Sequence, residues 1–149
     1  MASWQQWLAK GDVKTHQTSK HEIDNLRALI RRDLADAAVT ALSADRRFAT
    51  AYNAALQAAT IAIACSGYRV SARAGHHKVT FEAAGVAIGS EASTLTDYFE
   101  TCRRKRNVID YMNSSVATDT EAEEIVERAS EFRSLVENWV RRYHSSLSI

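Results

Sequence analysis

The residues best suited to chemistry lie in the stretch CRRKRNVIDYMN, from Cys102 to Asn113. It opens with a run of cations, and an amide, a carboxylate and a phenol follow shortly after them. If the stretch is helical, successive side chains rotate by about 100°, so the consecutive cations cannot share one face. Some of them must point toward the protein or toward a ligand.

One stripe of this helix would collect the polar groups. Arg103, Arg106, Asn107 and Asp110 fall at positions i, i+3, i+4 and i+7, and Tyr111 lies one turn beyond Asn107. In one interpretation the cations face solvent near a helix end, where the dipole favours them, and Arg106 pairs with Asp110. In the other the stripe is a binding site, because Asn is a poor helix former and is usually kept for a specific hydrogen bond.

Histidines and cysteines add few candidates. His76 and His77 follow a glycine in an expected loop, from which they can fold over the Arg106 stripe; alternatively, one packs at a helix start and the other faces water. Adjacent histidines are poorly disposed to share a metal. Cys65 and Cys102 lack the spacing of zinc ligands. The sequence therefore predicts no metal and no cofactor, and two reduced, largely packed thiols.

Composition limits the partners. The chain has 149 residues, with 19 Lys plus Arg against 18 Asp plus Glu, so any nucleic-acid site must be a local patch. The N-terminal residues lack the continuous apolar core of a signal peptide, and the most apolar run, AALQAATIAIAC, is too short and too broken to span a bilayer. These features predict one soluble, cytoplasmic domain without a membrane partner.

The elements that must position these residues are predicted to be helices. The chain has no proline and five glycines, so little interrupts its long runs of helical period. Ser19 and Glu22 have the spacing of a capping box at the start of a helix expected to reach Leu42. A second helix is expected to start at Ser43 and to stop at Gly67.

The second half of the chain continues this pattern. Residues 68–77 are expected to form a loop before a short apolar helix that ends near Gly89. The helix at 91–113 carries the basic stripe, and the last helix opens with a capping box from Thr118 to Glu121. Short connections predict an all-α, antiparallel four-helix up-and-down bundle with an additional short helix. The expected parts are an N-terminal segment at 1–18, the helical bundle at 19–144 and a frayed C-terminus at 145–149.

Three segments resemble one known family. The order RRKRNVIDY on the helix before the last, the run AYNAALQAA and the leading helix EIDNLRALIRRDLADA resemble the HEPN superfamily over about Ser19 to Trp139. HEPN domains are small helical bundles found beside minimal nucleotidyltransferases and in toxin–antitoxin and phage-defence systems. The resemblance implies a HEPN-like fold, a homodimer, an RNA or nucleotide ligand and a nucleotidyltransferase antitoxin as partner. Tyr52 and Asn53 of AYNAALQAA are expected to serve the core and inter-helix hydrogen bonds, with a ligand role left open.

The residues of catalytic HEPN ribonucleases can be compared with this chain one by one. Those enzymes carry an Arg, a polar residue directly after it and a His a little more than one turn farther on, and two protomers bring these groups together. Arg106 and Asn107 match the first two, but no His lies at the required spacing, because positions 108–113 hold none. Asp110 is the remaining candidate base, although a carboxylate beside an arginine has a lowered pKa and repels phosphate.

The resemblance leaves two functions open. In the first, the chain is an RNA-targeting toxin or defence component, a metal-independent endoribonuclease regulated by a nucleotidyltransferase that modifies Tyr111. In the second, it is a noncatalytic HEPN module that binds nucleotide, RNA or a protein partner, because the usual His is absent. Both place the ligand on the same expected residues, Arg103, Arg104, Arg106, Asn107, His76 and His77.

Overall fold

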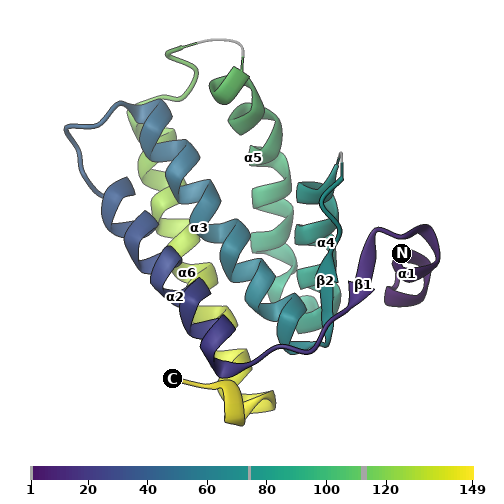
Figure 1. Ribbon diagram of the computed structural model, residues 1–149. Helices are drawn as coiled ribbons and strands as arrows, with labels where there is room; N and C mark the ends of the chain where they lie inside the picture. Colours follow the sequence, from purple (N-terminus) through teal and green to yellow (C-terminus); the bar gives the residue numbers. More distant parts are fainter. Residues whose placement is uncertain (1, 74, 112–113) are drawn as a thin grey trace.

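Four long helices form the bundle, and a shorter one packs beside them (Figure 1). The computed structural model describes residues 2–73, 75–111 and 114–149, and the side chains of Asp110 and Tyr111 lie outside the described part. The helices are α2 Lys20–Ala37, α3 Ala44–Cys65, α4 His76–Ile88, α5 Ser93–Tyr111 and α6 Asp119–Tyr143. Helices α2 and α5 run one way, and α3, α4 and α6 run the other way. The predicted all-α bundle with an additional short helix is confirmed.

Side chains at the helix starts fix where α3 and α6 begin. The Ser43 hydroxyl accepts a hydrogen bond from the backbone N–H of Arg46, 3.2 Å away, at the start of α3. At α6 the Thr118 hydroxyl accepts from the N–H of Glu121, and the Glu121 carboxylate accepts from the N–H of Thr118. The capping box predicted from Thr118 to Glu121 is therefore confirmed.

The capping box predicted at the start of α2 is only half formed. Ser19 accepts from the N–H of Glu22, but the Glu22 carboxylate binds His16 and Thr18 instead of returning to the Ser19 backbone. Burial opposes ionisation there, yet the hydrogen bonds with Thr18 and His16 hold the pKa of Glu22 below its ordinary value. The Glu22 carboxylate therefore binds two side chains in place of the backbone N–H that the sequence pattern predicts.

Helix α2 ends at Ala37, before the expected limit at Leu42. The buried Arg47 of α3 donates from Nε to the carbonyl of Ala37, 2.9 Å away. The last carbonyls of a helix lack intrahelical partners. Because Arg47 supplies one from outside, the chain can turn toward α3 at this point.

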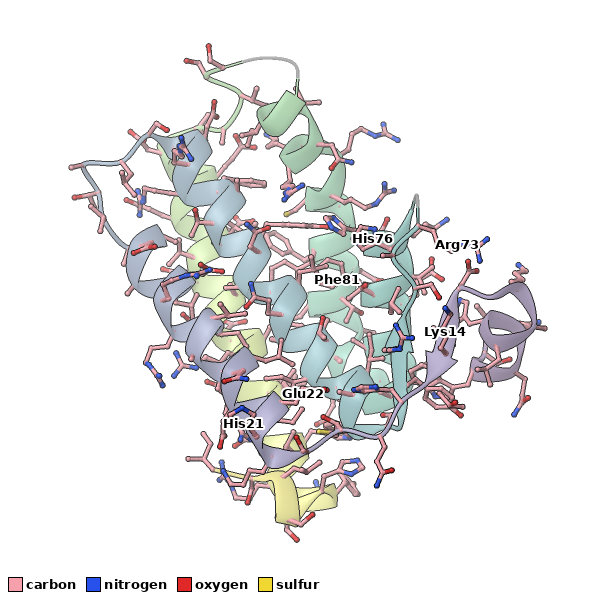
Figure 2. The ribbon with its side chains drawn as sticks, viewed as in Figure 1. Lys14, His21, Glu22, Arg73, His76 and Phe81 are labelled. Atoms are coloured by element: carbon pink, nitrogen blue, oxygen red, sulfur yellow. The ribbon has the colours of Figure 1, made fainter. Side chains whose placement is uncertain are left out.

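The N-terminal residues and part of the expected loop form regular structure. Helix α1 (Trp4–Lys10) precedes strand β1 (Val13–Thr15), which pairs antiparallel with β2 (Tyr68–Val70). The prediction of a loop at 68–77 is therefore wrong for the residues of β2. Figure 2 shows Lys14 on β1, on the same side of the molecule as the start of α4. Trp4 stacks on Tyr68 with ring centres 4.2 Å apart, so this tryptophan packs α1 onto the sheet.

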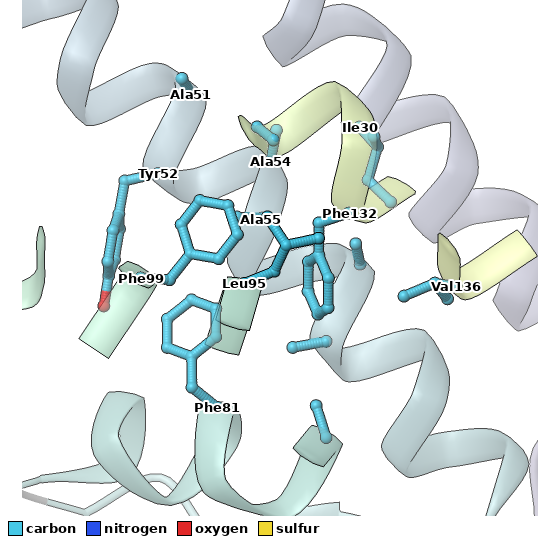
Figure 3. Close-up of a cluster of buried hydrophobic side chains, with 14 of the residues drawn as sticks. Ile30, Ala51, Tyr52, Ala54, Ala55, Phe81, Leu95, Phe99, Phe132 and Val136 are labelled. Atoms are coloured by element: carbon cyan, nitrogen blue, oxygen red, sulfur yellow. The ribbon is translucent and has the colours of Figure 1, made fainter. Parts of the chain in front are cut away.

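An aromatic stack joins the helices of the core (Figure 3). Phe99 of α5 has no exposed surface, and its ring centre lies 5.5 Å from that of Phe81 on α4 and 5.5 Å from that of Phe132 on α6. The facing side of α3 is rich in alanine, which allows the neighbouring helices to approach closely. Tyr52 of α3 lies at the edge of this cluster, where the figure shows its ring beside those of Phe81 and Phe99.

The two cysteines are free thiols, as expected. Cys102 is buried and Cys65 is half-buried. Burial raises the pKa of each thiol to about 11, so neither has the thiolate character of a reactive cysteine.

The end of the chain is tied to α2. Residues Ser145–Leu147 form a 3-10 helix, and the carbonyl of Leu147 accepts a hydrogen bond from Arg27 at 2.7 Å. Arg27 also pairs with Glu137 of α6 at 2.8 Å. The segment that was expected to fray is therefore held by hydrogen bonds at Leu147.

Helix α3 is long and apolar enough to cross a membrane by length and composition, and 61% of its apolar window is buried inside the protein. The sequence analysis had judged its apolar run too short and too broken. More than half of this window therefore faces the interior of the helical bundle.

Removal of the central aromatic ring tests this core. We expect Phe99→Ala to lower the free energy of unfolding by about 3–5 kcal/mol, because it removes a fully buried ring and leaves a cavity. Leu29→Ala removes an apolar side chain that is 37% exposed, and this control should change stability by about 0.5 kcal/mol or less. Urea unfolding followed by circular dichroism measures both. Equal losses for the two variants would contradict the described core.

Candidate functional site

Arg106 is oriented by helix α3. Its Nη2 donates a hydrogen bond to Oδ1 of Asn53, 3.2 Å away. Its guanidinium carbon lies 5.7 Å from the centre of the Tyr52 ring, a distance at which the ring attracts a cation. Tyr52 is fully buried and therefore presents a fixed surface. Arg106 is thus not a solvated residue of an isolated helix face.

Tyr52 and Asn53 make the core and inter-helix contacts that the sequence predicts. Tyr52 belongs to the core, and Asn53 makes an inter-helix hydrogen bond. Burial raises the pKa of Tyr52, and Arg106 only partly offsets this effect, so the phenol keeps its proton at neutral pH. A neutral phenol can lie beside the guanidinium and still donate a hydrogen bond.

A groove opens between the start of α4 and the face of α5. We call it the arginine groove, and the side chains used below to describe it are Arg73, His76, His77, Arg103, Arg106 and Asn107. Figure 2 shows Arg73 and His76 together at the end of the β2–α4 connection. Among the described residues that line the groove, none is acidic. The residues come from segments far apart in sequence, and together they form a local positive surface on a nearly neutral protein.

Both histidines have hydrogen-bond partners at Nδ1. The Nδ1 of His76 lies 2.9 Å from the carbonyl oxygen of Arg73. A carbonyl only accepts, so this contact requires the proton of His76 on Nδ1, and in the neutral ring Nε2 is then an acceptor. The Nδ1 of His77 lies 3.5 Å from the hydroxyl of Tyr52. The two rings are in edge contact, with centres 4.3 Å apart.

The other cations of the run RRKR point in different directions. Arg103 pairs with Glu100 at 2.8 Å and still lines the groove. Lys105 pairs with Glu121 of α6. Arg104 is exposed and does not line the groove, unlike the other expected binding residues. The rotation of a helix thus divides the run among ligand surface, neighbouring helix and solvent.

Two expected site residues cannot be placed by their side chains. Asp110 and Tyr111 have helical backbone at the end of α5, and their side chains lie outside the described residues. The catalytic prediction for Asp110 and the modification prediction for Tyr111 therefore stay predictions.

A carboxylate fixes the connection that follows α5. Asp45, in the first turn of α3, accepts hydrogen bonds at Oδ1 from the backbone N–H groups of Val116 and Ala117, at 2.9 and 2.7 Å. The residues just before α6 are thereby tied to the start of α3, the helix that also orients Arg106. The sequence analysis did not identify Asp45 because nothing local marks a partner so distant along the chain.

Arg73 is also a groove residue that the sequence analysis missed. It follows β2, and its Nη1 donates to the carbonyl of Lys10 at 3.0 Å and lies 3.8 Å from the Asp12 carboxylate. The N-terminal segment therefore holds one wall of the groove. The closeness of Arg73 to His76 and His77 in the sequence was the available signal for this groove residue. A residue in an expected loop has no predicted position, so the signal could not be used.

Comparison with known proteins gives a family and no nearer relative. The family model described as SAV_6107-like HEPN matches residues 37–137. No curated protein and no solved structure matches the chain significantly. The matched region begins at the end of α2 and includes α3, α4, α5 and most of α6, and with them every side chain that we assign to the groove. The chain belongs to the SAV_6107-like HEPN family.

Proposed function

We propose that this HEPN protein binds the phosphate groups of RNA in the arginine groove. The observation that supports this proposal is the orientation of Arg106 by Asn53 and Tyr52, next to Arg103 and Asn107. A guanidinium offers phosphate a planar fork of donors. Because two groups of α3 already restrict the side chain, less conformational entropy is lost when the ligand binds.

The groove also offers groups that suit a nucleotide. The amide of Asn107 can donate to and accept from a base or a sugar. The exposed ring of His76 offers a stacking surface of the kind that single-stranded nucleic acid uses. A free nucleotide has the same chemistry, and the experiment below includes one.

The noncatalytic interpretation rests on the absence of a histidine after Arg106 on α5. The positions after Arg106 hold Asn107, Val108 and Ile109, then Asp110, and none supplies an imidazole. With α5 as the only source of catalytic groups, the domain would bind RNA and leave it intact.

A ribonuclease activity is a second candidate function, because two imidazoles of α4 line the groove beside Arg106. His76 and His77 line it with Arg106, and the Arg73 carbonyl leaves Nε2 of His76 as the acceptor nitrogen of the neutral ring. In the proposed step, Nε2 of His76 takes the proton of the ribose 2′-hydroxyl and O2′ bonds to phosphorus. The P–O5′ bond breaks, and O5′ takes a proton from the imidazolium form of His77, which is left neutral. Arg106 stabilises the charge on the phosphate.

The cellular role belongs to the same proposal. We propose a cytoplasmic toxin or defence component that acts as a homodimer and is regulated by a nucleotidyltransferase that modifies Tyr111. Two symmetric copies of the groove at a two-fold axis would make one larger anion site. Sedimentation of the purified chain tests the dimer, and intact mass after coexpression with a neighbouring nucleotidyltransferase tests the modification.

Substitution of Arg106 tests the binding proposal. We expect Arg106→Ala to weaken binding of a labelled single-stranded oligouridylate by roughly tenfold or more, because a charge-assisted contact to phosphate is lost. Arg106→Lys keeps the charge but not the fork, so it should fall between wild type and Ala. Fluorescence polarisation at several salt concentrations measures the affinities.

The matched control is Arg133→Ala, which removes an exposed cation from α6, outside the groove. Circular dichroism establishes that every variant keeps its helices. If Arg106→Ala binds the oligouridylate as tightly as Arg133→Ala does, the arginine groove is not the RNA site.

Cleavage assays separate the two candidate functions. If the histidines are catalytic, wild type cleaves the oligouridylate in the presence of EDTA, and His76→Gln and His77→Gln each slow cleavage by roughly a hundredfold while binding persists. Gel analysis of end-labelled RNA measures the rates. Intact RNA after prolonged incubation with wild type, or unchanged rates in both variants, would contradict the catalytic candidate and leave the binding function.

A further inference from the structure

A second polar pocket adjoins the arginine groove at Arg106. It is formed by the first half of α3 and the last turns of α5, and its lining includes Ser43, Arg46, Thr50, Asn53 and Arg106. Arg106 lines both hollows. The order along the surface is therefore the α4 start with Arg73 and His76, then Arg106, then the α3 start with Arg46.

Arg46 is available to a ligand. It is exposed at the start of α3, and among the described residues its guanidinium makes no hydrogen bond or ion pair. The hydroxyls of Ser43 and Thr50 and the amide of Asn53 stand near it in the same lining. These groups all bind phosphate or ribose oxygens by hydrogen bonds.

Among the described residues that line this second pocket, one is a carboxylate, Asp45, and the protein partly satisfies its charge. Asp45 accepts two backbone hydrogen bonds, from Val116 and Ala117. Its position in the first turn of α3 is also one at which the helix dipole favours negative charge. The carboxylate therefore serves the fold, and Arg46 beside it retains its charge for a ligand.

Arg46 is separated along α3 from Asn53, the residue that contacts Arg106. Arg46 and Asn53 lie on the same helix, and at about 1.5 Å per residue they are separated by roughly 10 Å along its axis. Phosphates of one nucleic-acid strand follow each other at about 3.4 Å of axial rise in a duplex. A ligand that contacts Arg46 and the groove on the other side of Arg106 must carry several phosphates.

We infer that the pocket at Arg46 is a second phosphate subsite, and that the ligand is a single-stranded RNA oligomer that passes over Arg106 rather than a mononucleotide. The inference rests on the proposed function, because it assumes that the arginine groove binds the same strand. A strand offers the repeated phosphates that a line of separated cations can neutralise, and groove binders of single strands use this arrangement.

Two ligands of different length test the inference. The probes are uridine 5′-monophosphate and a short labelled oligouridylate, and the variants are Arg46→Ala, Arg106→Ala and the control Arg133→Ala. We expect Arg46→Ala to weaken the oligomer by roughly fivefold, to lower the slope of log K against log salt by about 0.7, and to leave the monophosphate unaffected. Arg106→Ala should weaken both ligands.

The outcomes separate this inference from the proposed function. If Arg46→Ala binds the oligomer with the affinity and salt slope of Arg133→Ala, the second subsite is wrong while a loss in Arg106→Ala still supports the groove. An equal loss for both ligands in Arg46→Ala also overturns separate subsites. If Arg106→Ala matches wild type with both ligands, the proposed function fails. Where the monophosphate binds too weakly to measure, the salt slope of the oligomer decides.

Discussion

The contact of Arg106 with α3 is the interaction on which the candidate site depends. It joins a cation of α5 to the Asn53 amide and the Tyr52 ring, and so turns one residue of a basic run into a donor of fixed position. The contact requires α3 and α5 to keep their register. The stack of Phe81, Phe99 and Phe132 fixes α5 against α4 and α6, and Asp45 ties the start of α3 to the chain beyond α5.

Tyr52 links the core to the groove. Its ring is packed against Phe81, with centres 5.6 Å apart, while its hydroxyl lies beside Nδ1 of His77. One buried side chain thus sets the position of an arginine from α5 and contacts a histidine from α4. A change in core packing near Tyr52 would therefore reach both Arg106 and His77, although neither belongs to the core.

Local patterns predicted the helices well and their partners poorly. The capping box at Thr118 and Glu121 is complete because both groups lie within one turn and nothing else competes for them. At α2 the same spacing failed because His16 and Thr18 bind the Glu22 carboxylate. Strand β2 was missed because three residues are too few for a recognisable alternation, and its partner β1 lies far away along the chain.

The site shows the same division. Helical spacing placed Arg103 and Arg106 on one stripe, and both line the arginine groove. Spacing alone does not show that Arg104 faces solvent or that Lys105 pairs with Glu121. Nor does it show that Asn53 binds Arg106. These contacts depend on which helices pack against each other. Arg46 and Arg73 had no local signature, and only the folded chain places them at the two ends of the proposed RNA path.

Chemical-shift mapping of the isotope-labelled protein, titrated with a single-stranded oligouridylate, tests whether Arg106 and Asn53 form the RNA site. We expect the largest changes at the backbone N–H groups of Asn53, Arg106 and Asn107 and at the two asparagine side-chain amides, with further changes toward His76 and Arg46. The exposed face of α6 around Arg133 should be unaffected. Changes confined to α6, or spread evenly over the surface, would show that Arg106 and Asn53 do not form the RNA site.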